Sequence, residues 1–189
     1  QHLAQPDPQY FTIVSNMRLV PAKNIPFTLE IIKALAEKYP TVRYRIIGSG
    51  PLRATLEQKV KDLDLLSIVD FRGSLTPEQV VHEYAQADIQ LLLSTNESFG
   101  KVIIEAGLVG VPTLASETLG ARTIIDAEKT GLLVPINDAT ATVTALERLY
   151  QDREECRRLG QIARQVYAQK YQRQQAVDQI IAFRQSLAS

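Results

Sequence analysis

The sequence predicts an α/β protein with a Rossmann-like, doubly wound parallel sheet and a helical C-terminal extension. Two observations lead to this fold class. Short apolar segments that favour β-strands alternate with amphipathic segments that favour helices as far as residue 135, and the chain from about Thr140 has a helical pattern throughout. Strands separated by helices are typical of a parallel sheet, because each helix carries the chain back to the edge where the next strand starts.

Six segments have the apolar composition of strands: residues 11–17, 42–47, 67–71, 88–94, 112–116 and 131–135. Helices are predicted over residues 24–40, 52–63, 77–87 and 100–109. The third of these helices is opened by Thr76 and Pro77, which are typical of a helix start. The 189 residues contain no repeat, low-complexity tract or long linker, so we expect one compact domain.

The composition excludes several classes of function. Lys and Arg together number 21, as do Asp and Glu, so no net charge would draw the chain to nucleic acid or to an anionic membrane. No apolar run reaches the length of a membrane-spanning helix. Cys156 is the one cysteine, which excludes an internal disulfide and a cysteine-based zinc site and fits a reducing compartment. The only histidines are His2 and His82, so a histidine metal cluster is not expected either.

Ligands of such sheets bind beyond the carboxyl ends of the strands, so the loops that follow the strands hold the candidate site. Arg18 and Lys23 follow the first strand, where two cations can clamp a phosphate; the alternative is a pair of solvated loop charges. Gly48, Ser49 and Gly50 follow the second strand, where glycines permit a tight turn and bring an anion close to a helix N-terminus. A purely structural turn is the alternative for this segment.

The turn after the second strand lacks the dinucleotide-binding fingerprint, because Arg53 stands where the third glycine would be. Asp70 lies near the end of the third strand, roughly where an acid would bind the ribose of a cofactor. A nicotinamide-dependent enzyme is therefore an alternative that the sequence leaves open.

The stretch ESFGKVIIEAGLVGVPTLA contains an acid in an apolar setting, Glu105. An ionised carboxylate is costly to bury unless it is paired or hydrogen-bonded. Either Glu105 pairs with Lys101 one turn earlier, or it accepts hydrogen bonds from the hydroxyl groups of a ligand. The start of the same helix, at Gly100, has free N–H groups and a dipole that suit a phosphate.

A second acid, Glu97, lies in the loop before this helix. It is either an acid that favours the helix entry or a second contact to the ligand. We expect the core-facing stripe of the helix to consist of Phe99, Val102, Ile103 and Ala106.

Taken together, these motifs resemble a known family. ESFGKVIIEA followed by GVPTLAS resembles the two glutamates separated by seven residues in retaining glycosyltransferases of the GT-B fold, family four. MRLVPAKN resembles the loop whose Arg and Lys hold the donor diphosphate, and IIGSGPL resembles the glycine turn beside the nucleotide. VDFRGSLTPEQVVHEYAQADIQLLLS and GLLVPIND resemble the segments that precede and follow the glutamate motif. The resemblance covers roughly residues 11–150 and is to the C-terminal, donor-binding domain of such enzymes.

The resemblance implies that the substrate is a nucleotide-sugar, for which we expect a UDP-sugar, and that transfer retains the anomeric configuration without metal or other cofactor. By the same resemblance, Glu97 orients the sugar, Glu105 binds the ribose, and Arg18 and Lys23 stabilise charge on the departing diphosphate. The other expected substrate contacts are in the glycine turn and at the start of the helix: Gly48, Ser49, Gly50, Ser98, Phe99, Gly100, Lys101 and Val102.

The sequence departs from the family pattern in two ways. The N-terminal acceptor-binding domain of such enzymes has no counterpart in this chain, and the first residue is Gln rather than Met, which suggests a fragment or a processed chain. We therefore expect residues 1–171 to be the donor-binding domain and residues 172–189 to be a last helix that packs on the missing domain. Gly120 matches the glycine loop of the family, but Ala121 and Arg122 change the part of that loop that faces sugar or acceptor.

Three alternatives to a transferase half remain open: a non-catalytic nucleotide-sugar binding module, a domain like that of a nucleotide-sugar epimerase, and an NAD-dependent oxidoreductase. The expected partners are a nucleotide-sugar donor, the missing N-terminal domain and an acceptor glycan or lipid. An apolar stripe in the last helix also predicts self-association of the fragment: Ala176, Val177, Ile180, Phe183 and Leu187. The expected location is cytoplasmic, with the missing domain as the part that would attach to the inner face of a membrane.

Overall fold

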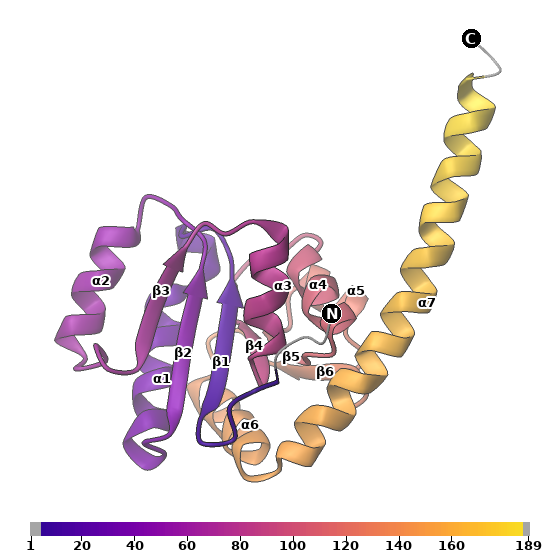
Figure 1. Ribbon diagram of the computed structural model, residues 1–189. Helices are drawn as coiled ribbons and strands as arrows, with labels where there is room; N and C mark the ends of the chain where they lie inside the picture. The colour runs from indigo at the N-terminus through magenta and orange to yellow at the C-terminus, as the bar shows by residue number, and fades with distance from the viewer. Residues whose placement is uncertain (1–4, 187–189) are drawn as a thin grey trace.

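The computed structural model describes residues 5–186, with side chains described as far as residue 171. Its centre is a sheet of six strands in the order β3-β2-β1-β4-β5-β6, and every neighbouring pair is parallel (Figure 1). The strands are β1 (Phe11–Asn16), β2 (Val42–Ile47), β3 (Val69–Gly73), β4 (Ile89–Leu92), β5 (Thr113–Ser116) and β6 (Gly131–Val134). The predicted fold class, a Rossmann-like parallel sheet, is confirmed.

The order of the strands reverses between β1 and β4, which makes this pair the topological switch point of the sheet. The chain builds the sheet outward from β1 to β3, and then returns to add β4 on the other side of β1. Loops that leave β1 and β4 at their carboxyl ends therefore diverge to opposite faces of the sheet. In open parallel sheets, ligands bind at this point of divergence.

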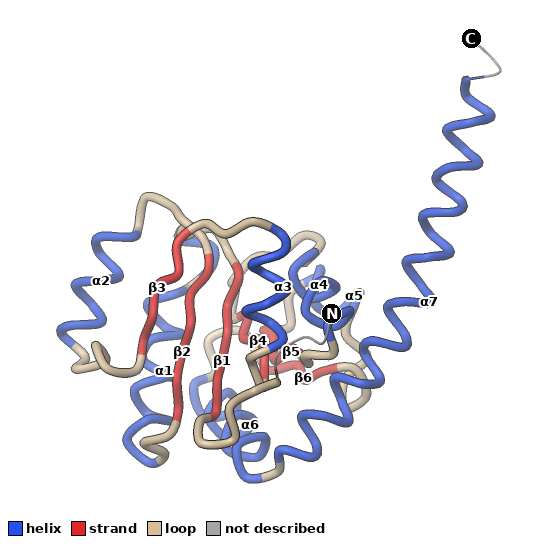
Figure 2. The backbone as a smooth tube through the Cα atoms, in the orientation of Figure 1, coloured by secondary structure: helices blue, strands red, loops and turns tan. Residues whose placement is uncertain are grey.

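Helices cover both faces of the sheet, as Figure 2 shows. They are α1 (Ile25–Lys38), α2 (Arg53–Asp62), α3 (Pro77–Ala85), α4 (Lys101–Val109), α5 (Leu119–Ile124), α6 (Ala139–Gln151) and α7 (Arg153–Ser186). Successive leucines around β4 belong to different cores: Leu91 packs in a cluster with residues of α1 and α6, while Leu92 packs with residues of α4, α5 and α7. A strand buried on both sides has the near-continuous apolar sequence on which the strand predictions depended.

The predicted strands and the four predicted helices lie within two residues of the observed ones, and β2 coincides with residues 42–47. The predicted start of α3 is also confirmed, because the Thr76 hydroxyl accepts from the Gln79 amide at 3.4 Å while Gln79 Oε1 accepts from the Thr76 amide at 2.9 Å. This reciprocal capping satisfies two N–H groups at the start of the helix. The short helix α5 was not predicted.

Helix α7 runs without interruption from Arg153 to Ser186, so the predicted domain boundary at residue 172 falls inside it. The first part of α7 packs closely on α4: a Cβ on Gly107 would lie 2.3 Å from the ring of Tyr167. In Figure 1 the distal part of the helix points away from the sheet. The predicted apolar stripe lies beyond residue 171, where side chains are not described, and Leu187 is outside the described residues, so its packing on another domain stays a prediction.

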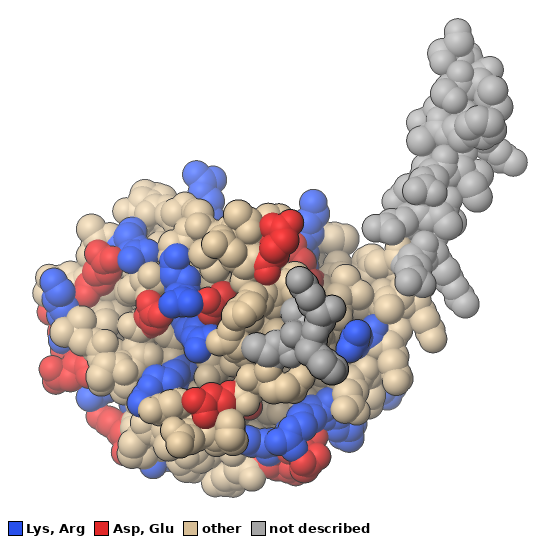
Figure 3. Space-filling view, viewed as in Figure 1, with Lys and Arg blue, Asp and Glu red and all other residues tan. Residues whose placement is uncertain are grey.

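Charged side chains are interspersed over the face of the molecule that Figure 3 shows, without a large region of one sign. This distribution agrees with the equal numbers of acidic and basic residues. Among the helices that the structure describes, none is long and apolar enough to cross a membrane.

Candidate functional site

The loops after β1, β2 and β3 surround an open hollow at the carboxyl edge of the sheet, and α4 contributes one side of it. The hollow has a volume of about 490 Å³. Its lining residues are Asn16, Met17, Arg18, Ile47, Gly48, Ser49, Gly50, Ser74, Leu75, Val80 and Val102. Five of the residues predicted from the sequence thus line one cavity: Arg18, Gly48, Ser49, Gly50 and Val102.

The glycines of the turn after β2 form the floor of this hollow because a side chain would not fit there. Gly48 has φ +121°, and a Cβ on it would lie 1.9 Å from the carbonyl oxygen of Met17. A Cβ on Gly50 would lie 2.5 Å from the carbonyl oxygen of Leu19, whose amide donates to Ser49 O at 2.9 Å. The glycines are therefore required by the structure of this turn. They also leave a surface of bare backbone in the hollow, next to the carboxyl ends of β1 and β2.

The two predicted cations of the loop after β1 have different surroundings. Arg18 is exposed at the hollow. Lys23 ends a 3-10 turn over Pro21–Lys23 and forms an ion pair with Glu97, whose carboxylate lies in the loop after β4. The side chains of Lys23 and Glu97 are only 19% and 16% exposed, so this pair is largely withdrawn from water.

Backbone contacts fix the loop that carries Glu97. Glu97 Oε1 accepts from the Gly100 amide at 3.2 Å, and the carbonyl oxygen of Glu97 accepts from the Gly120 amide at 2.8 Å. Thr95 N donates to Ala22 O at 3.0 Å, which joins this loop to the one after β1. The Lys23–Glu97 pair therefore lies where the loops after β1 and β4 meet the start of α5, next to the N-terminus of α4.

The start of α4 has the geometry expected of an anion-binding helix N-terminus. Gly100 is the N-cap in the left-handed region, with φ +80°, and no acidic residue occupies the first turn of the helix. Ser98, Phe99 and Lys101 are exposed around this start. The first N–H groups of a helix have no partner within it, so they are available to a ligand.

The predicted core stripe of α4 is wrong at Phe99, which is 51% exposed. The buried residues of the helix are Ile103, Ile104, Ala106 and Gly107. The reason is that Phe99 precedes the helix and so does not follow its periodicity.

Glu105 is exposed, so the expectation that its carboxylate lies in an apolar environment is wrong. Its neighbours Ile104 and Ala106 are buried, and the helix turns Glu105 itself to the solvent. The ion pairs one turn apart in the described part of the chain do not include one between Lys101 and Glu105. Glu105 is thus available to a ligand, as the second interpretation of this acid requires.

Tyr84 is a residue near the site that the sequence interpretation missed. This fully buried tyrosine of α3 has its hydroxyl 3.5 Å from the carbonyl oxygen of Val102. Burial raises the pKa of the Tyr84 hydroxyl, the Asn16 side chain opposes this rise, and the charge of nearby Glu105 adds to it. The phenol stays neutral, and it links α3 to α4 beneath the hollow. The only signal in the sequence was the helical spacing that places Tyr84 on the same face as Val80.

Within the residues that the structure describes, no group of three or more His, Cys, Asp or Glu side chains could hold a metal ion. Asp70, the acid on which the dinucleotide alternative depended, is exposed and paired with Arg72 at 2.9 Å.

A parallel six-stranded sheet, with a glycine floor and a helix N-terminus beside two acids at its carboxyl edge, defines a Rossmann-like α/β domain. Residues 3–166 match the family of glycosyl transferases group 1. The chain belongs to this family.

A similar curated relative is the D-inositol 3-phosphate glycosyltransferase of Saccharomonospora viridis, 32% identical over 182 residues that cover 91% of this chain and 42% of that protein. The chain spans between 16% and 42% of the length of the first curated relatives it matches. It therefore corresponds to a part of each of them.

Two solved structures show the same fold. The C-terminal domain of a group 1 glycosyl transferase from Francisella tularensis has a TM-score of 0.76, with 23% identity and 88% of each chain covered. The Anabaena protein HepE, solved in complex with UDP and glucose, has a TM-score of 0.81, with 20% identity over 92% of this chain and 48% of the other.

Proposed function

We propose that this chain is the donor-binding half of a retaining glycosyltransferase that takes its sugar from a nucleotide-sugar. The observation that carries the proposal is the convergence at one sheet edge of Arg18, the glycine floor, the start of α4 and the Lys23–Glu97 pair. A diphosphate needs cations and free N–H groups, and a sugar needs hydrogen-bond acceptors such as carboxylates. Both kinds of group are present here within neighbouring loops.

The phosphates would lie near Arg18, Lys23 and the N-terminus of α4. Cations and a helix dipole at that place stabilise the negative charge that develops on the leaving nucleoside diphosphate. This is the part of the chemistry that the donor half can supply from its own residues without a metal ion.

The two acids would bind the two ends of the donor. Exposed Glu105 would accept hydrogen bonds from the ribose, and Glu97 would accept them from the sugar. The turn Gly48–Gly50 would approach the nucleotide through its backbone, and the segment Ser98–Val102 would contact the sugar or the distal phosphate, with Lys101 adding charge at its exposed position.

A UDP-sugar is the donor we propose. The support is the similarity in fold to HepE, which was solved with UDP and glucose. The acceptor half of the cleft would come from an N-terminal domain, because the chain matches less than half the length of the first curated relatives. We therefore expect purified residues 1–189 to bind donor and to transfer no sugar to glycan or lipid acceptors, and donor-dependent glycosylation by this chain alone would contradict that expectation.

Isothermal titration calorimetry tests the proposal. UDP, GDP, ADP and NADH are titrated into the chain, each with and without EDTA. We expect a nucleoside diphosphate to bind, UDP most tightly, with an affinity that EDTA does not change. Binding of NADH alone, binding that needs a divalent ion, or no binding at all would each overturn a stated part of the proposal.

A further inference from the structure

Lys23 and Glu97 neutralise each other in a site that is otherwise arranged for an anion. They are 74 residues apart in the sequence, and their side chains are largely withdrawn from water. The loop after β1 is joined to the loop after β4 by the Thr95–Ala22 hydrogen bond, so the pair is held by the fold. A diphosphate that binds Lys23 therefore competes with Glu97 for the N–H donors of the ammonium group.

Taking Lys23 away leaves a partly buried carboxylate with fewer partners. The Gly100 amide, at 3.2 Å from Glu97 Oε1, still donates to Glu97, but no cation replaces the ammonium group. A largely desolvated charge that loses its counter-ion costs free energy, which is subtracted from the affinity of the arriving ligand. A free nucleoside diphosphate brings nothing to offset this cost.

A nucleotide-sugar, which still carries its sugar, can compensate for the loss of the counter-ion at Glu97. The hydroxyl groups of a sugar next to the distal phosphate can donate hydrogen bonds to Glu97, and bonds to a carboxylate are among the strong ones. Lys23 is then free to pair with the phosphates. Donor and free diphosphate thus differ in whether Glu97 keeps a partner.

We propose that Glu97 competes with the diphosphate for Lys23 and so makes the site prefer the nucleotide-sugar over the free nucleoside diphosphate. After the sugar has been transferred, Glu97 loses its hydroxyl partners and recovers Lys23, which weakens the hold on the product. This inference rests on the proposed function, and it assigns Glu97 a role as a selectivity residue that acts through Lys23.

The test is a double-mutant cycle at Glu97 and Lys23. The affinity of residues 1–189 for UDP is measured by calorimetry for the wild type and each variant. In Glu97→Gln the ammonium group of Lys23 is released from its ion pair, so UDP should bind roughly fivefold more tightly than in the wild type. In the Lys23→Ala background the same Glu97→Gln change should leave the affinity unchanged. Glu117→Gln removes an exposed acid at the end of β5, on the same sheet edge, and serves as the control for charge alone.

Three outcomes overturn the inference while leaving the proposed function intact: UDP binds the wild type and Glu97→Gln equally, it binds the variant more weakly, or Glu97→Gln strengthens binding equally when Lys23 is absent. The last result would show direct repulsion between Glu97 and phosphate.

If UDP binds neither the wild type nor Glu97→Gln, the proposed function fails as well. Inorganic pyrophosphate, titrated in parallel, should show the same tightening, because the competition concerns phosphate and not the base; a pyrophosphate affinity that Glu97→Gln leaves unchanged would contradict the inference.

Discussion

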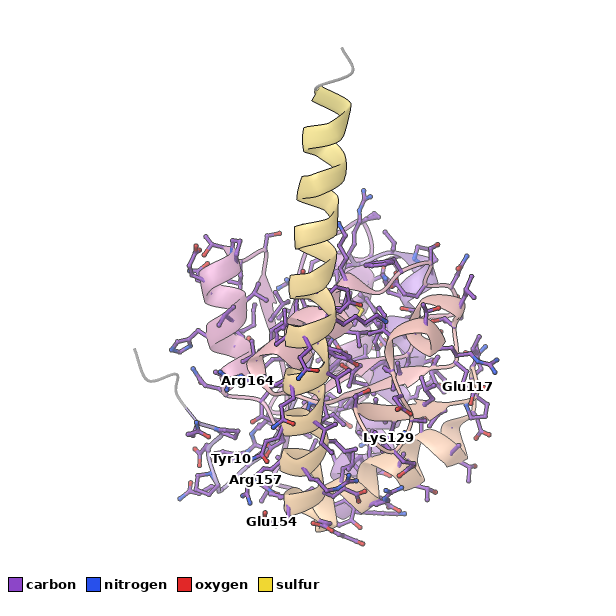
Figure 4. All side chains as sticks on the ribbon, turned by 90° about the vertical axis from the view of Figure 1, so that its right-hand side faces the viewer. Tyr10, Glu117, Lys129, Glu154, Arg157 and Arg164 are labelled. Atoms are coloured by element: carbon purple, nitrogen blue, oxygen red, sulfur yellow. The ribbon has the colours of Figure 1, made fainter. Side chains whose placement is uncertain are left out.

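Two hollows lie at opposite edges of the same sheet, and the larger one is not at the candidate site. The hollow at the carboxyl edge has about 490 Å³, whereas one at the amino edge has about 640 Å³. The latter is lined by the N-terminal segment, the loops before β4 and β5, and four residues of α7: Arg153, Cys156, Arg157 and Arg164. Figure 4 shows Arg157 and Arg164 along this helix.

Three charged residues at the amino edge, Asp88, Arg153 and Arg157, already have partners within the protein. Asp88 accepts from the Thr12 amide at 2.8 Å and lies 3.7 Å from Arg153, and Arg157 pairs with Glu154. Burial raises the pKa of the Asp88 carboxyl, and the Thr12 amide and the charge of Arg153 oppose that rise.

Backbone direction separates the two edges further. Helix α4 starts at the carboxyl edge and ends at the amino edge, where Arg164 lies close to its C-cap Gly110. Free N–H groups favour anions at the start of a helix, and free carbonyl groups favour cations at its end. The direction of the backbone, more than the size of a cavity, therefore distinguishes the proposed diphosphate site from the hollow at the amino edge.

The largest expected effect is on folding, at the floor of the carboxyl-edge hollow. Gly48→Ala places a Cβ against Met17 O in a left-handed conformation, so the free energy of unfolding should fall by about 3 kcal/mol. Gly73→Ala is the matched control, because Gly73 also has a positive φ but open space around it, and about 1 kcal/mol is expected there. Urea unfolding of both variants measures the difference, and equal losses would show that strain alone, without the loop contact, explains Gly48.

The next effect is on ligand binding and compares one arginine from each hollow. Arg18→Ala should weaken nucleoside diphosphate binding by about 2 kcal/mol, the scale of a charge-assisted hydrogen bond. Arg157→Ala, at the amino edge, should leave that affinity unchanged. Calorimetry of the two variants shows which edge of the sheet binds the nucleoside diphosphate. Weaker binding in Arg157→Ala with unchanged binding in Arg18→Ala would place the site at the larger hollow.

The smallest effect concerns the exposed acid of α4. Glu105→Gln keeps the shape of the side chain and weakens it as an acceptor, so nucleotide affinity should fall by about 1 kcal/mol. Thermal stability should not change, because Glu105 is exposed. A drop in melting temperature at unchanged affinity would assign Glu105 a structural role.

Much of the difference between the carboxyl and amino edges of the sheet could be predicted from the sequence. The apolar strands and amphipathic helices gave the sheet, and the rule that ligands bind at carboxyl ends brought Arg18, Gly48 and Gly100 to one edge. Helix α5 escaped prediction because it has only six residues, which is too short for a periodic pattern.

Other features depend on three-dimensional contacts that a linear pattern does not contain. The ion pair of Lys23 with Glu97 joins two loops whose conformations are set by their contacts to each other. Glu105 was expected in an apolar environment because its sequence neighbours are apolar, yet a helix separates neighbours onto different faces. The need for glycine at position 48 comes from Met17, which is distant in sequence but lies beside it where β1 and β2 end.

Chemical-shift mapping with UDP tests the central claim most directly. The chain is labelled with ¹⁵N and titrated with UDP in the presence of EDTA. The account predicts that the amide shifts concentrate at the carboxyl edge, at Gly48, Ser49, Gly50 and Gly100, while Ala87, Asp88, Gly110 and Val111 at the amino edge stay unchanged. Shifts that concentrate at the second set of residues, with the first set unmoved, would contradict it.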